Sequence, residues 1–273
     1  MKKTHILLTL LAVALAVGIL FVSCDTGTKS DSDDKASNST SGFIGEKLEI
    51  SGQQVYTMIE KNDDVEENEN RITFTEYAGT MELDDPWGGT AKITGGKLSC
   101  SIGTPDYSDD LNNFKSELSE IYNDVKLTPS NGVKFSKLDG LSNWGYPLPH
   151  YSLYRGNVNE IYIFSGGFTW TNTFGKVWYI YVDGNVTISG KGKQSLEKGK
   201  NQEGEDYTLT ITTKDFSLSL KKGWNALYNI EVWSGTGGSP NFNFTTTLST
   251  LNLNNPPSLK WILEENDDDD DED

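Results

Sequence analysis

Alternating apolar and polar positions dominate the second half of the chain. The period of two is clear in Tyr207–Ile211 (YTLTI) and in Phe216–Leu220 (FSLSL), and it places every second side chain on the same face of a β-strand. Val177–Val182 (VWYIYV) is apolar or aromatic throughout, as is typical of a central strand that is covered on both faces. The pattern predicts a mainly β fold of the β-sandwich type.

One segment follows the helical period instead. Its apolar residues fall on one face of a helix and are Leu111, Phe114, Leu118, Ile121 and Tyr122. Ser108 is expected to cap this helix, and Asp109 and Asp110 suit its positive end. We expect this single amphipathic helix to cover one side or one end of the first sheet.

Two glycine-containing stretches predict tight hairpin turns. They are Thr94–Lys97 (TGGK) and Val182–Asn185 (VDGN), where glycine relieves the positive φ that mirror-image turns require. Asp139–His150 is rich in Gly, Pro and Asn and divides the folded body near its middle. This division predicts two β-rich units, 43–140 and 151–263, with a single larger sandwich as the alternative.

The first 23 residues have the composition of a secretory signal. Lys2 and Lys3 precede an apolar run from Ile6 to Val22, which is the order of a charged start and a hydrophobic middle. The run closes Phe21-Val22-Ser23-Cys24, which resembles the lipobox of bacterial lipoproteins in its relaxed spirochaetal form. The resemblance implies that Cys24 receives lipid after cleavage of residues 1–23. An uncleaved membrane helix is the alternative, since the run is short for a span.

Residues 24–42 are predicted to be the lipidated cysteine and a flexible tether. The stretch after Cys24 has no large apolar side chain, so it cannot bury enough surface to offset its ordering entropy. The lipobox, this tether and three later segments resemble a family of treponemal lipoproteins; the segments are Lys176–Gly190, Phe216–Tyr228 and Ser258–Glu265. The resemblance implies an envelope location and no particular activity.

Charge excludes one class of partner. The formal net charge is −17, and an acidic protein repels the phosphate backbone, so no nucleic-acid partner is expected. Residues 264–273 are almost entirely acidic and are predicted to be a disordered tail.

Cysteine and histidine usage excludes most catalytic centres. With Cys24 lipidated, Cys100 has no cysteine to pair with, and it shares a strand face with Leu98 and Ile102, so we expect a buried, inert thiol. His150 is the only histidine after the signal, which excludes a histidine-rich metal site. The chain contains no Gly-x-Ser-x-Gly, P-loop or complete dinucleotide fingerprint. We therefore expect no catalytic residue, no metal site and no cofactor.

Aromatic residues are unusually abundant, with 11 Phe, 7 Trp and 12 Tyr. Some lie in stretches rich in Asp, Asn and Gly, where stacking on a sugar or contact with a protein is as natural as a place in the core. These candidate binding residues are Trp87, Trp144, Tyr146 and Trp170. Their alternative role is to close the ends of the sandwich.

These observations predict a binding or interaction module of the bacterial cell envelope, with a glycan or protein ligand. It is expected to be lipid-anchored to a membrane, the outer one in preference to the inner, on its periplasmic or surface face. The alternative is a carbohydrate-active hydrolase, which needs only two carboxyl groups at a set separation. The candidate carboxyl groups are Asp84, Asp85, Glu160 and Glu231.

Overall fold

A computed structural model gives the arrangement of the chain and describes residues 42–61, 71–83, 89–105, 109–129, 131–138, 141–143, 150–163, 168–200, 204–254 and 257–266. Among these residues, strands dominate and only α2 (Leu111–Ile121) is helical. The mainly β, sandwich-type fold with one helix is confirmed. The predicted signal and the anchoring Cys24 lie outside the described residues, as does the tether except for Gly42.

The described strands form one large sheet and one small sheet. Strands of the large sheet from the first half of the chain are β1 (Phe43–Gly45), β2 (Leu48–Glu60), β3 (Ile72–Glu76), β4 (Met81–Leu83), β5 (Thr90–Thr94), β6 (Lys97–Ile102), β7 (Asp109–Asp110), β9 (Lys134–Leu138) and β10 (Leu141–Asn143). Those from the second half are β11 (His150–Ile163), β12 (Thr169–Val182), β14 (Gln194–Lys200), β15 (Asp206–Thr213), β17 (Gly223–Thr236), β18 (Asn241–Thr250) and β19 (Lys260–Asn266). The small sheet holds β8 (Asn123–Thr128), β13 (Val186–Lys191) and β16 (Phe216–Leu220).

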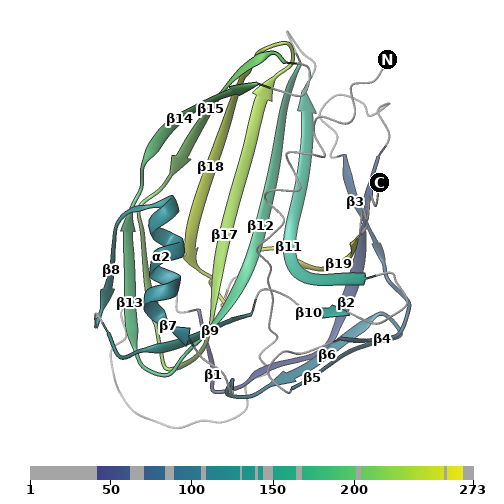
Figure 1. Ribbon diagram of the computed structural model, residues 1–273. Coiled ribbons are helices and arrows are strands. Elements are labelled where there is room, and N and C mark those ends of the chain that lie inside the picture. Colours follow the sequence, from purple (N-terminus) through teal and green to yellow (C-terminus); the bar gives the residue numbers. More distant parts are fainter. Residues whose placement is uncertain are drawn as a thin grey trace, which may run out of the picture.

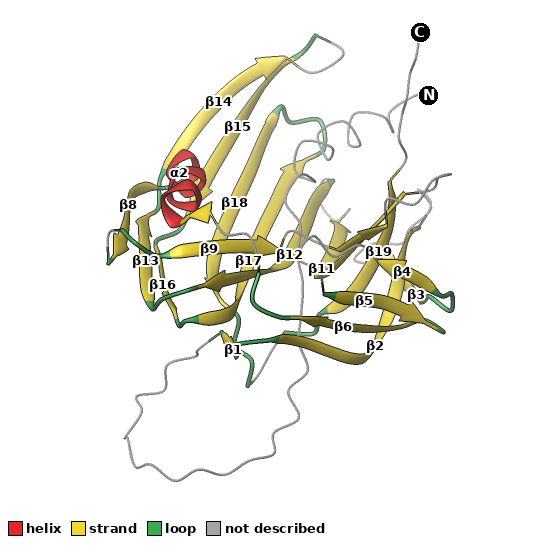
Figure 2. Cartoon of the chain, turned by 60° about the horizontal axis from the view of Figure 1, so that its bottom comes forward, coloured by secondary structure: helices red, strands yellow, loops and turns green. Residues whose placement is uncertain are grey.

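The large sheet follows the order β14-β15-β18-β17-β12-β11-β19-β2-β6-β5-β4. Its described pairs are antiparallel except β15 with β18 and β19 with β2, which are parallel. Figure 2 shows the small sheet and α2 at one end of the molecule and β2, β5 and β6 at the other. In Figure 1 the long strands β11, β12, β17 and β18 extend well beyond α2. On β12, β17 and β18 one end of the strand contributes to the core beneath α2, and the other end projects past the helix.

The packed half of β12 separates two hydrophobic cores. Its odd-numbered side chains, Val177, Tyr179 and Tyr181, belong to the core shared with β2, β5 and β6. Its even-numbered side chains, Trp178, Ile180 and Val182, belong to the core shared with α2, β8, β13 and β16. We call this second side of the sheet the helix-side face. The prediction that 177–182 is a central strand covered on both faces is confirmed.

Helix α2 buries the predicted face with two differences. Leu111, Phe114 and Leu118 are buried in the helix-side core, as expected. Ile121 is 41% exposed, because the helix ends there. The N-cap is Asp110, whose Oδ1 accepts a hydrogen bond from the backbone N–H of Asn112 at 2.9 Å, and not the predicted Ser108, which lies outside the described residues.

The two predicted hairpins have different outcomes. The Thr94–Lys97 turn joins β5 to β6, with positive φ at Gly95 (54°) and Gly96 (75°), so this prediction is confirmed. The Val182–Asn185 prediction is wrong. At Val182 both edges of β12 are occupied, by Gly223 of β17 and Phe135 of β9. The strand that follows, β13, therefore crosses to the small sheet and pairs with β16 and β8.

The predicted ranges 43–140 and 151–263 are joined by strand pairing. Strand β2 pairs with β19, β9 with β12, and β8 with β13. Both ranges contribute side chains to both cores, so the two cores do not correspond to the two halves of the chain. The folded body also extends past its predicted end at Leu263. Strand β19 continues to Asn266, because Glu264, Glu265 and Asn266 pair with the first residues of β11, and Glu264 also accepts a hydrogen bond from the hydroxyl of Tyr154.

Candidate functional site

Apolar side chains continue along the helix-side face beyond the helix. In an antiparallel pair, residues directly opposite each other share a face, and Trp170 of β12 lies opposite Gly235, with Trp233 two positions back along β17. The same pairing carries the surface across β18 and β15. We call this surface the aromatic face; it comprises Trp170, Tyr207, Leu209, Ile211, Trp233, Phe242 and Phe244. Each of these side chains is half-buried. Trp178 and Leu227, on the same face but beneath α2 and the small sheet, are buried.

The rings of the aromatic face contact one another. Trp233 and Phe244 have ring centroids 4.5 Å apart, and Phe242 lies 6.2 Å from Trp170 and 6.3 Å from Tyr207. The indole of Trp170 lies over Gly235, where an added Cβ would sit 2.9 Å from Nε1. A larger residue at position 235 would therefore displace the indole of Trp170. The ring contacts form two groups, Trp170–Phe242–Tyr207 and Trp233–Phe244, on four adjacent strands, β12, β17, β18 and β15.

A row of polar side chains lies between the aromatic face and the helix-side core on β17 and β18 and continues across β12 to Tyr154 of the first core. We call it the polar belt; it comprises Tyr154, Lys176, Asn229, Glu231, Thr246 and Glu264. Asn229 donates to Oε1 of Glu231 at 2.8 Å and accepts from Thr246 at 3.1 Å. The Lys176 ammonium lies 4.8 Å from the ring centroid of Tyr154. These residues lie on five consecutive strands of the sheet, from β18 to β19.

Burial shifts the ionisation of the polar belt. Burial raises the pKa of Glu231, and the Asn229 hydrogen bond and the Lys176 charge only partly offset it. Burial likewise raises the pKa of Glu264, against the Tyr154 hydrogen bond and the Lys176 charge. Burial lowers the pKa of Lys176, although both carboxylates favour its charged form. Two carboxyl groups and one ammonium group of the belt are therefore shielded from solvent. Groups with such perturbed pKa values often lie at functional sites.

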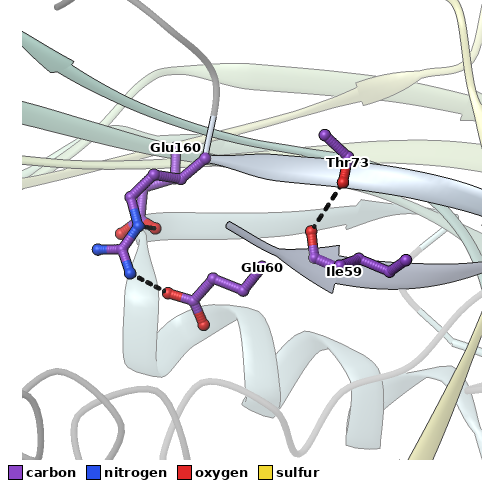
Figure 3. Close-up of polar contacts among 5 residues, drawn as sticks. Ile59, Glu60, Thr73 and Glu160 are labelled. Atoms are coloured by element: carbon purple, nitrogen blue, oxygen red, sulfur yellow. Dashed lines mark hydrogen bonds and ion pairs between the residues drawn. The ribbon is translucent and has the colours of Figure 1, made fainter. Parts of the chain in front are cut away.

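Glu160 is held in an ion pair next to the aromatic face. It is 3% exposed, and its Oε2 lies 3.8 Å from Nε of Arg71. Nη2 of Arg71 donates to Oε1 of Glu60 at 2.8 Å, so one guanidinium faces two carboxylates (Figure 3). The Arg71 backbone N–H also donates to the Glu160 carbonyl at 2.8 Å. Glu160 therefore ties the start of β3 to the edge of β11.

Only one of the predicted binding residues lies in a described segment. Trp170 belongs to the aromatic face, whereas Trp87, Trp144 and Tyr146 lie outside the described residues. Among the carboxyl groups, Glu231 belongs to the polar belt and Glu160 pairs with Arg71, while Asp84 and Asp85 lie outside the described residues. His150 is the first residue of β11.

Cys100 is 5% exposed, with Leu98 and Ile102 buried beside it, which confirms the predicted burial. A hollow of about 640 Å³ adjoins it between β2, β4, β5 and β6. The carboxylates at this hollow, Glu49 and Glu82, are both exposed. The hollow is formed by strands other than those that carry the aromatic face and the polar belt, so it contributes to neither.

Sequence reasoning missed Trp233, Phe242 and Phe244. All three lie in alternating strands, where the pattern indicates a buried face and cannot show how far the covering layer extends. The available signal was Asn241–Phe244 (NFNF), which alternates aromatic and polar side chains with no aliphatic residue. The ion pair of Glu160 was also missed, because Arg71 is distant from it in sequence.

Comparison of the chain with protein-family models, with curated proteins and with solved structures found no match. In the part of the chain that the structure describes, no helix combines the length and the apolar composition that a membrane crossing needs. None of the described residues forms a group of three or more His, Cys, Asp or Glu side chains placed to hold a metal ion.

Proposed function

We propose that this chain is a lipid-anchored binding module of the bacterial cell envelope, and that it binds a glycan through the aromatic face. The anchor and location rest on the signal-like N-terminus, Cys24 and the resemblance to treponemal lipoproteins. The binding activity rests on one observation, the aromatic layer that continues past helix α2 with half-buried rings. Exposed contiguous apolar surface on a folded protein marks an interaction site.

The chemistry of the surface favours a sugar over a protein segment. Sugar rings present C–H groups that stack on indole and phenyl faces, and the face carries two Trp–Phe pairs in ring contact. A protein ligand is the alternative occupant of the same surface.

The test uses the full chain in detergent, with glycan arrays and a peptidoglycan pull-down. Trp233→Ala is expected to weaken binding by about 1–3 kcal/mol, the scale of a buried aromatic contact. The matched control is Ile161→Ala, because Ile161 is 38% exposed and lies opposite Thr171 on the other face of the same sheet. A parent protein that retains no glycan, or a Trp233→Ala variant that binds as the parent does, contradicts the proposal.

A carbohydrate-active hydrolase is the second candidate, and one observation supports it. Glu231 and Glu264 are two largely buried carboxyl groups with raised pKa values on either side of Lys176, and a general acid needs a raised pKa. A hydrolase would release reducing ends from the bound glycan, and Glu231→Gln would stop the release without preventing binding. Binding without any release of reducing ends contradicts this candidate.

A further inference from the structure

Asn172 is a buried amide within the aromatic face. It lies between Trp170 and Phe174 along β12, directly opposite Trp233 of β17 and Glu160 of β11. The residue is 9% exposed, and its Oδ1 is buried with no hydrogen-bond partner among the described residues. A buried acceptor without a donor is unfavourable, and native structures seldom retain one without a reason.

Other buried amides on this sheet are paired. Asn229, which lies on the same face of β17 as Trp233, donates to Glu231 and accepts from Thr246. Asn225 donates to the carbonyls of Lys221 and Gly223 and accepts from the Lys221 N–H. The unused Oδ1 is therefore a property of position 172 within the aromatic face, and not a general property of buried asparagines on β12 and β17.

The charges near Asn172 are already opposed. Glu160, on one side, faces Arg71, and Arg71 also faces Glu60. Lys176, farther along β12, interacts with Glu264 and Glu231. An acidic ligand at Asn172 would thus approach carboxylates, and the nearby cations are already paired with those carboxylates, whereas a neutral hydroxyl group would meet an unpaired acceptor.

We propose that Asn172 is the hydrogen-bonding anchor of the aromatic face, and that its ligand is an uncharged pyranose. The C–H face of the sugar packs on the indole of Trp170 or Trp233, and a hydroxyl group donates to Oδ1 of Asn172. This inference rests on the proposed glycan-binding function and adds the sugar class and the residue that selects it. Asn172 holds the ligand and takes no part in a chemical step.

The experiment compares Asn172→Leu with Asn225→Leu in the full chain in detergent, because Asn225 is a buried, paired asparagine that belongs to neither the aromatic face nor the polar belt. The probes are methyl glycosides of neutral hexoses and N-acetylhexosamines, with the matching uronic acids, and the readouts are the dissociation constant and the melting temperature. Loss of one hydrogen bond at a desolvated site weakens binding about tenfold. Asn172→Leu should do so with an unchanged or raised melting temperature, because it removes an unpaired acceptor. Asn225→Leu should lower the melting temperature, because it removes three hydrogen bonds, and leave the affinity unchanged.

The outcomes separate this inference from the proposed function. If Trp233→Ala weakens binding and Asn172→Leu does not, the role of Asn172 is wrong and the aromatic face stands. If the uronic acids bind more tightly than the neutral sugars, the sugar class is wrong. If no glycoside binds the parent, the proposed function fails and this inference fails with it. Should Asn172→Leu not fold, Asn172→Thr restores a hydroxyl acceptor, and we expect it to bind within a fewfold of the parent.

Discussion

Truncation of Trp224 tests how much β17 contributes to the first core, which it shares with β12, β2, β5 and β6. Trp224 is 0% exposed, its Nε1 donates to the carbonyl of Gly103 at 2.9 Å, and its ring meets Tyr181 edge-on with centroids 5.6 Å apart. A buried Trp→Ala change costs about 3–5 kcal/mol through lost burial and the remaining cavity. The orphaned carbonyl adds about 1 kcal/mol. The total of about 4–6 kcal/mol corresponds to a melting temperature lowered by roughly 10–20 °C for a domain of this size.

The assay is thermal unfolding followed by near-ultraviolet circular dichroism, with Trp170→Ala as the matched control. Trp170 is half-buried and contacts Phe242 at the edge of the packed region, so its truncation should cost about 1–2 kcal/mol. Trp224→Phe keeps most of the volume and loses the N–H, which isolates the hydrogen bond to Gly103. The reasoning is refuted if Trp224→Ala and Trp170→Ala melt within a few degrees of each other.

Three further predictions concern ionisation, the buried thiol and the anchor. Burial raises the folded pKa of Glu231 above its ordinary 4.5, so its contribution to stability is present below about pH 4.5 and is lost as the pH rises through the folded pKa. Relative to Glu231→Gln, the parent should therefore lose urea resistance as the pH rises above about 4.5, and parallel pH profiles would contradict this. Cys100 is 5% exposed, so it should react slowly with a thiol reagent until denatured, and Cys100→Asp should cost several kcal/mol; fast native labelling would show that the strand faces the other way. Cys24→Ser should abolish palmitate incorporation, and a variant that still incorporates label would exclude lipidation at this residue.

Local sequence signals predicted elements well and their partners poorly. Phe216–Leu220 alternates in burial as its letters do, because alternation follows directly from strand geometry. Thr94–Lys97 and Val182–Asn185 have similar turn signals, yet only the first is a hairpin. The Val182–Asn185 segment is instead bonded to β9. The Asp183 N–H donates to the Lys134 carbonyl, and the Lys134 N–H donates to Asp183 Oδ1. No local pattern carries that information.

The site was predictable only where an aromatic residue stood out from its surroundings. Trp170 was visible as a Trp flanked by Thr and Asn. Trp233 was not, because an alternating strand has the same letters whether its apolar face is fully or partly covered. What distinguishes Trp233 from the buried Trp178 is the length of the second layer, which ends with α2 and the small sheet. The orphaned acceptor of Asn172 depends on packing across three strands and has no sequence signature.

The position of β19 has a consequence for the order of folding. This last strand lies between β11 and β2, and its parallel pairing with β2 joins Trp261 to Val55. The ladder β2-β6-β5-β4 therefore reaches the rest of the large sheet through a segment that is synthesised after every other described strand. Pairings so distant in sequence must close a long loop before they gain any contact energy, which slows folding. Until β19 pairs, β2 has no ladder to β11, so the large sheet is completed only after this C-terminal strand has been made.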